Sequence, residues 1–256
     1  MTTRRILIAG NWKLNKSIAE AKTFTQDLAQ ALPSLTKVEV VIAPTFTALA
    51  SLDAITQSSP IQLSAQDVYW QDSGAFTGEL SPSLLRDAGC SWCIVGHSER
   101  RQLFAETDAW VAKKAEALLR HGLKPIICVG ETLEQRQQGS TLQVITQQLS
   151  AVLTDLPLDL GSFAIAYEPV WAIGTGKTAS AQDAQDVHGN IRELLHKHCG
   201  DRANTTQVLY GGSVKPDNVR HLLEQPDIDG ALIGGASLNL DSFLAIIQTA
   251  IELGEN

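Results

Sequence analysis

A single carboxylate, Glu168, stands where an apolar run ends and a stiff segment begins, in the stretch AYEPVWAIGTGKTA. Pro169 fixes its own φ and holds Glu168 in extended geometry. The apolar residues 170–173 suit a solvated loop only if they sometimes cover something, and Gly174 and Gly176 supply a permissive backbone for hinges. The pattern indicates a lid that closes over a carboxylate base; the alternative is an ordinary strand-to-helix connection with static packing.

Two other turns carry groups that could stabilise negative charge. In GNWKLN, Asn11 is an amide donor, and Lys13 is either a point charge for a phosphate or developing enolate, or a solvated turn lysine. In VGHSERR, His97 precedes Ser98, which we expect to be a helix N-cap. The helix amides and dipole would then lower the pKa of His97 and keep the imidazole neutral, unless the histidine is structural. Glu99 either pairs with Lys13 or is a favourable first-turn acid.

Two glycine pairs follow the last two predicted strands, in YGGSV (210–214) and IGGAS (233–237). Paired glycines let a backbone approach an anion closely and present its N–H groups, and Ser213 adds a hydroxyl. The second pair is Gly234 and Gly235. Because both turns carry such a pair, together they favour a phosphate site.

These turns are joined by short, almost continuously apolar runs that alternate with stretches of helical period. Such runs are typical of parallel strands covered on both faces. The expected strands are Arg5–Ala9, Val38–Ala43, Ile61–Ala65, Cys93–Val95, Pro125–Val129, Phe163–Tyr167, Gln207–Tyr210 and Ala231–Ile233. We expect Ser180 to cap a helix over Ala181–His198, and Asn239 or Asp241 to cap the last helix.

Strict alternation allows an open doubly wound sheet or a closed barrel. Eight strand–helix pairs in 256 residues favour the barrel, and no GxGxxG follows the first strand. The sequence therefore predicts an α/β protein whose residues 1–256 form one eight-stranded parallel (β/α)8 barrel domain. In such barrels, catalytic residues lie at the carboxyl ends of the strands, where the turns above fall.

Composition excludes several classes of protein. The net charge of −8 argues against nucleic-acid and anionic-membrane partners. Neither a signal peptide nor a membrane-spanning run is recognisable, so we expect a cytoplasmic protein. Cys90 and Cys93 form a CxxC without a second ligand pair, which disfavours metal or redox use.

A long connection, Gln66–Leu80, follows the third expected strand. At about fifteen residues it exceeds an ordinary loop, and it carries Tyr69, Trp70 and Phe76. Aromatic residues in a protruding loop suggest a protein partner, of which a second copy of this chain is the simplest; the alternative is a self-packed surface loop.

Taken together, seven segments resemble the signature motifs of the triosephosphate isomerase family in that family's order, from Arg5 to about Ile251. The segments are GNWKLN, GAFTGE, GHSERR, CVGETLEQR, AYEPVWAIGTGK, YGGSVKP and ALIGGASL.

The resemblance implies interconversion of dihydroxyacetone phosphate and D-glyceraldehyde 3-phosphate through an enediolate, in glycolysis and gluconeogenesis, with no cofactor and no metal. It implies that Glu168 is the base and that His97 is a neutral electrophile. Asn11 and Lys13 would stabilise the oxyanion and bind substrate, and Glu99 would support Lys13 or share in proton relay.

By the same resemblance, the backbone of Gly174, Ser213, Gly234 and Gly235 would hold the phosphate. The segment 169–177 would close over it and exclude water, because an exposed enediolate phosphate can eliminate phosphate.

The resemblance also implies a homodimer in which Thr77 reaches the partner's site; a tetramer is an alternative. Asp67 stands where the family usually has Asn, near the expected interface, and we expect it to make the dimer more sensitive to pH. Two other functions stay open on this fold. One is a different phosphosugar isomerase, and the other is a non-enzymatic scaffold or surface adhesin.

Overall fold

The computed structural model describes residues 4–154, 156–172 and 179–255. Residues 173–178, which include Gly174, Gly176 and Lys177, lie outside the described residues, and so does most of the expected lid.

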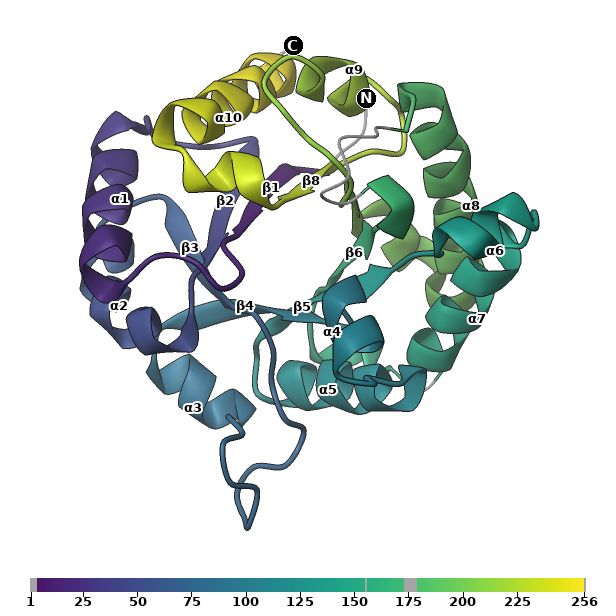
Figure 1. The fold of residues 1–256 in the computed structure, drawn as a ribbon, viewed down its shortest axis with the longest axis horizontal. Coiled ribbons are helices and arrows are strands. Elements are labelled where there is room, and N and C mark those ends of the chain that lie inside the picture. The colour runs from purple at the N-terminus through teal and green to yellow at the C-terminus, as the bar shows by residue number, and fades with distance from the viewer. Residues whose placement is uncertain (1–3, 155, 173–178, 256) are drawn as a thin grey trace.

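Eight parallel strands close into a barrel, in the order β1-β2-β3-β4-β5-β6-β7-β8, and the helices form a ring around it (Figure 1). This confirms the fold expected from the sequence. The strands are β1 Ile6–Asn11, β2 Val38–Ala43, β3 Ile61–Ala65, β4 Cys90–Val95, β5 Lys124–Val129, β6 Ala164–Tyr167, β7 Gln207–Tyr210 and β8 Gly230–Ile233.

The strand bounds differ from expectation mainly at β1 and β4. β1 extends to Asn11, which brings that amide onto the rim of the barrel. β4 begins at Cys90 rather than Cys93, because Trp92 is buried in the barrel and its indole N–H donates to Gln62 Oε1 at 3.0 Å. Trp92 is therefore part of β4, because the neighbouring strand β3 supplies the hydrogen-bond partner that its indole N–H needs.

Alternate side chains of the strands build two buried layers. One side-chain set fills the barrel and includes Leu7, Ala9, Trp92 and Leu232. The other packs outward against the helices and includes Ile8. This division follows from the two-residue period of a strand, and it explains why the strands read as continuously apolar.

Closure of the barrel between β8 and β1 depends on one glycine. Leu7 pairs with Gly230, whose φ is +151°. A Cβ on Gly230 would lie 2.0 Å from the carbonyl oxygen of Leu7, so any other residue would push the two strands apart.

The helices surround the strands and leave the carboxyl ends of the strands open. They are α1 Ile18–Ala31, α2 Leu49–Gln57, α3 Pro82–Asp87, α4 Ser98–Leu103, α5 Asp108–Arg120, α6 Leu133–Gln137, α7 Thr141–Leu153, α8 Ala181–Cys199, α9 Val219–Leu223 and α10 Leu240–Glu255. Short 3-10 helices are η1 Phe46–Ala48, η2 Leu158–Leu160, η3 Val170–Ala172, η4 Gly200–Asn204 and η5 Gly235–Leu238.

Two expected helix caps are confirmed. Ser180 caps α8 in a capping box with Asp183. Asn239 precedes α10, and its Oδ1 accepts from the backbone N–H of Ser242 at 2.9 Å, whereas Asp241 lies inside the first turn. Within the described residues, no helix combines the length and hydropathy that a membrane crossing requires.

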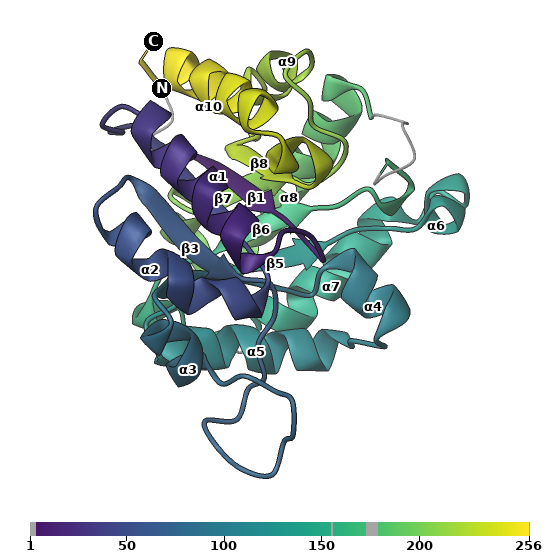
Figure 2. The ribbon, with the colours of Figure 1, turned by 60° about the vertical axis from the view of Figure 1, so that its left-hand side comes forward.

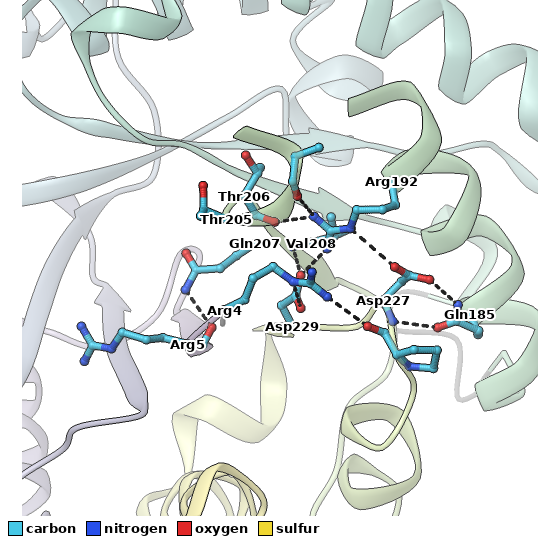
Figure 3. A network of polar contacts seen from close by, with 12 residues as sticks. Arg4, Arg5, Gln185, Arg192, Thr205, Thr206, Gln207, Val208, Asp227 and Asp229 are labelled. Atoms are coloured by element: carbon cyan, nitrogen blue, oxygen red, sulfur yellow. Dashed lines mark hydrogen bonds and ion pairs between the residues drawn. The ribbon is translucent and has the colours of Figure 1, made fainter. Parts of the chain in front are cut away.

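A network of ion pairs ties the amino ends of the last strands to α8 (Figure 3). Arg192 of α8 donates to the carbonyl oxygens of Ala203 and Thr206 and pairs with Asp229. Asp229 also pairs with Arg4. The two carbonyl contacts satisfy one guanidinium nitrogen, while Nε only approaches Asp227 Oδ1 at 3.5 Å. Together these contacts hold α8 against the amino ends of β7 and β8.

The long connection between β3 and α3 projects away from the barrel (Figures 1 and 2). Its aromatic residues pack on each other: the Tyr69 ring lies 4.1 Å from Trp70 and 4.6 Å from Phe76, and Trp70 lies 5.4 Å from Trp110 of α5. The loop is therefore packed at its base, while residues 71–79, at its tip, are exposed.

Candidate active site

A cavity of about 670 Å³ opens at the carboxyl ends of the strands. It brings together residues that the sequence places on five different turns. Of the predicted site residues, Asn11, Lys13, His97, Glu168, Ser213, Gly234 and Gly235 line it. Glu99 lies beside it, in contact with Lys13. Thr77 is exposed at the tip of the projecting loop, and Gly174 lies outside the described residues.

Glu168 and His97 are in direct contact. Glu168 follows β6, and one carboxylate oxygen lies 2.9 Å from Nε2 of His97. The other accepts from the backbone N–H of Ser98 at 2.8 Å. Both side chains are buried, so the pair forms a largely desolvated carboxylate and imidazole.

The surrounding backbone fixes where Glu168 stands. Its N–H donates to the carbonyl oxygen of Val129 at 2.7 Å, which continues the β5–β6 ladder by one residue. A Cβ on Gly130 would lie 1.8 Å from the carbonyl oxygen of Glu168. Glycine at 130 is therefore required for the end of β6 to lie this close to β5.

The pKa values of the pair are coupled. Burial raises the pKa of the Glu168 carboxyl, but the adjacent His97 and the Ser98 N–H lower it by more, so the net pKa is below its ordinary value. Burial lowers the pKa of His97, but the Glu168 carboxylate raises it by more, so the net pKa is above its ordinary value.

Two details of the His97 turn correct the sequence prediction. The N-cap of α4 is His97 itself rather than Ser98, because its Nδ1 accepts from the backbone N–H of Glu99 at 3.2 Å. The prediction of a lowered pKa for His97 is wrong for this arrangement, since a carboxylate from a distant strand faces Nε2. The helix N–H on Nδ1 nevertheless assigns the proton of a neutral imidazole to Nε2, toward the cavity.

Lys13 is held on every side. Its φ is +52°, a left-handed conformation that side chains seldom adopt. Its N–H donates to Asn11 Oδ1 at 3.1 Å, and its Nζ donates to Glu99 Oε1 at 2.6 Å. Glu99 therefore pairs with Lys13, and it also lies in the first turn of α4, so both predicted descriptions of Glu99 apply.

The segment after Glu168 is held by a buried carboxylate, that of Glu131. Oε1 of Glu131 accepts from the hydroxyl of Tyr167 at 3.2 Å and from the indole N–H of Trp171 at 3.0 Å. The guanidinium of Arg136 lies over the Trp171 ring at 4.5 Å. The described start of the expected lid, η3, is thus docked on the barrel through Trp171.

Lys13 lies beside one of the two glycine turns. A Cβ on Gly234 would lie 3.8 Å from Lys13 Nζ, which places the ammonium beside the start of η5. Ser213, after the other glycine pair, lines the same cavity, and its carbonyl oxygen accepts from Asn218 Nδ2 at 3.0 Å. A cation and closely approachable backbone amides are the donors that a phosphate prefers.

Gln66 is a supporting residue that the sequence analysis missed. Its Nε2 donates to the carbonyl oxygens of Lys13 and Ala43, both at 2.9 Å, and so joins the turn after β1 to the ends of β2 and β3. Its position directly after the third apolar run was the one signal available.

Asp67 lies in a buried group of ion pairs. Its two oxygens pair with Lys114 at 2.7 Å and Arg100 at 2.8 Å, and both cations also pair with Glu106. Glu106 accepts from the N–H of Gly96, the residue before the histidine. Burial raises the pKa of Asp67, with Lys114 opposing it.

The described residues contain no group of three or more His, Cys, Asp or Glu side chains that could hold a metal ion. Cys90 and Cys93 are both free and buried, and burial raises the pKa of Cys90 to about 12. The chemistry that the cavity itself supports is proton transfer by a desolvated carboxylate beside a hydrogen-bond donor, next to an anion site.

The chain matches one protein family over most of its length. The family model described as "Triosephosphate isomerase" matches residues 6–250. A protein of that name from Pelobacter propionicus is 54% identical over 247 residues, which cover 96% of this chain and 98% of that protein. Others of that name are 51% identical in Trichlorobacter lovleyi, with the same coverage, and 52% identical in Chloroflexus aurantiacus, covering 94% of this chain and 98% of that protein.

Replacing Glu168 by Gln should lower the pKa of His97 below its ordinary value. In the variant, burial and the Glu99 N–H on Nδ1 remain, while the carboxylate that raises the pKa is gone. The pKa is measured by following the ring nitrogens of His97 in a ¹⁵N NMR titration of parent and variant. Glu193→Gln, at an exposed position on α8, is the charge-matched control and should leave the value unchanged. An equal His97 pKa in parent and Glu168→Gln would contradict this account.

Proposed function

The chain belongs to the triosephosphate isomerase family and interconverts dihydroxyacetone phosphate and D-glyceraldehyde 3-phosphate; we propose that Glu168 is the base of this reaction and His97 its electrophile. The observation that carries the assignment is the contact of Glu168 Oε1 with His97 Nε2 inside a cavity that also holds Lys13 and the glycine turns. The reaction belongs to glycolysis and gluconeogenesis.

The phosphate lies on the backbone of Ser213, Gly234 and Gly235, with Lys13 beside it. Gly174 is proposed as a further contact, from outside the described residues. The protein carries a net charge of −8, so a dianion needs local cations to enter. Lys13 and Lys215 both line the cavity and supply them.

The base must leave its resting contacts to act. Held by His97 and the Ser98 N–H, Glu168 has a lowered pKa and is a weak base. Turned onto the substrate carbon in a cavity closed to water, it loses these partners and keeps its burial, which raises its basicity. The same movement frees the Nε2–H of His97 to donate to the substrate oxygen.

His97 is then neutral when it acts. With the carboxylate gone from Nε2, burial and the Glu99 N–H favour the uncharged ring. A neutral donor stabilises the developing enediolate, and Asn11 and Lys13 add an amide and a charge.

The protein also forms a homodimer in this proposal. A second cavity of about 330 Å³, lined by Lys13, His97, Glu99 and Asp67 among others, opens beside the active site. Its surroundings include apolar side chains that are unusually exposed: Leu14 at 95%, Leu103 at 74% and Phe104 at 61%. In this proposal, Thr77 of the partner's projecting loop enters this cavity, and the rest of the loop tip covers that surface.

We also propose that the reaction takes place in the cytoplasm. The cysteines at positions 90, 93, 128 and 199 are all free and buried, as suits a reducing compartment.

Glu168→Gln tests the reaction and the base together. Removing a general base should lower kcat for glyceraldehyde 3-phosphate isomerisation by about 10²- to 10⁴-fold, because Gln keeps the size but cannot accept the proton. The rate is measured in a coupled assay, with Glu193→Gln as the control that should match the parent. A folded parent without isomerase activity would overturn the reaction, and a fully active Glu168→Gln variant would overturn the base.

Thr77→Arg tests the dimer. The much larger side chain of arginine should not fit a cavity of about 330 Å³ into which Thr77 and its neighbours dock. Sedimentation should therefore show monomers, and activity should fall with the dimer. The matched control is Gln143→Arg, at an exposed position on α7, which should sediment like the parent. Dimers of Thr77→Arg as tight as those of the parent would refute this docking.

The dimer should tighten as the pH falls from neutral toward the carboxyl range. Filling the second cavity would bury Asp67 further and raise its pKa again, so the dimer would bind more protons than two monomers and gain stability on acidification. Asp67→Asn should remove this dependence. Equal dimer dissociation constants for parent and variant across acidic to neutral pH would refute the role of Asp67.

A further inference from the structure

Lys16 is a second lysine in the turn between β1 and α1, and the proposed reaction does not use it. Its Nζ donates to the carbonyl oxygen of Leu238 at 3.0 Å. The same ammonium lies 4.3 Å from the ring centre of Phe24 and 5.4 Å from that of Trp12. Burial lowers the pKa of this half-buried lysine, with Glu20 opposing it. A partly desolvated ammonium needs such partners, so these contacts hold the Lys16 side chain in one position.

The carbonyl that Lys16 contacts ends the turn that presents the glycine pair. Leu238 is the last residue of η5, which starts at Gly235. Inside this turn, the N–H of Ser237 donates to Gly234 O at 2.9 Å, and its hydroxyl donates to Ile233 O at 3.0 Å. Since η5 is only one helical turn long and is bonded internally, fixing its end also fixes the amides at its start.

The other end of the connection is the turn that carries Lys13. Lys13 and Lys16 have φ values of +52° and +69°. This left-handed backbone is disfavoured for lysine and persists only where surrounding contacts hold it. Gln66 holds the turn from the side of β3, through Lys13 O. Lys16 holds it from the side of β8, where Lys13 Nζ lies beside Gly234.

We propose that Lys16 is a positioning residue, whose ammonium ties the Lys13 turn to η5 and so sets the distance between the cation and the backbone amides of the phosphate site. It does not touch the phosphate. The inference rests on the proposed function, because it concerns the anion site of that reaction.

The test is Lys16→Met, which keeps the length of the side chain and removes its ammonium. We expect the dissociation constant for inorganic phosphate, measured by calorimetry, to rise about tenfold, which corresponds to about 1.4 kcal/mol. KM should rise in parallel while kcat stays within about twofold of the parent, because the loss falls on binding of the phosphate in both substrate and transition state.

Three further variants separate charge from backbone. Lys16→Gly adopts the left-handed conformation without strain, so it also loses affinity only if the ammonium matters. Lys16→Arg keeps a cation and should recover most of the affinity. Lys22→Met, at an exposed position on α1, removes a lysine elsewhere and should match the parent. Circular dichroism checks each fold, and the glycine variant decides if the methionine variant does not fold.

The outcomes are distinct. Parent-like phosphate affinity in Lys16→Gly overturns the proposal, whether or not Lys16→Met is weakened, because the effect would then come from backbone strain alone. A rise in KM for Lys16→Met that Lys16→Arg reverses supports it. A folded parent that neither isomerises triose phosphates nor binds phosphate would instead overturn the proposed function.

Discussion

The contact between Glu168 and His97 is the constraint on which the site depends. It joins the ends of β4 and β6, although the two residues are 71 positions apart in the chain. Glu168 reaches His97 because β6 runs one residue past its last regular pair along β5, which the absent side chain of Gly130 allows. The histidine faces the carboxylate because its other nitrogen caps α4. A backbone N–H thus orients each partner: that of Ser98 holds Glu168, and that of Glu99 holds His97.

The two ends of the barrel differ in what their charged residues contact. At the amino ends of β7 and β8, Arg192, Asp229 and Arg4 form ion pairs that lie outside the active-site cavity (Figure 3). At the carboxyl ends, the charged groups are left with partners that a ligand can replace or share. Strands covered on both faces supply the rigidity that lets a functional end be assembled from separate turns.

The sequence was sufficient for the strands and for most of the residues around the cavity, because both follow local rules. Apolar runs mark strands, and glycine pairs, a lysine and a carboxylate at their ends mark the site. What it could not supply was the effect of groups from distant strands. The pKa of His97 was predicted from its own helix, but Glu168 reverses the direction. The partners of Gln66 and Asp67 could not be read from the sequence, because β2, α4 and α5 supply them.

In the proposed reaction, the substrate and Glu168 compete for one hydrogen-bond donor, Nε2–H of His97, and this competition links substrate binding to proton transfer. At rest, the Nε2–H of His97 is satisfied by Glu168. A substrate oxygen that takes this donor displaces the carboxylate, which retains only the Ser98 N–H. Leaving a buried carboxylate with one partner is unfavourable, so the proposed roles predict that Glu168 moves toward the substrate proton when His97 engages the substrate oxygen. Asn11, Lys13 and Glu99 are held by contacts with one another and with backbone, so they stay fixed while the base moves. In this proposal the site combines fixed polar groups, Asn11, Lys13 and Glu99, with one carboxylate, Glu168, that exchanges its resting contacts for the substrate.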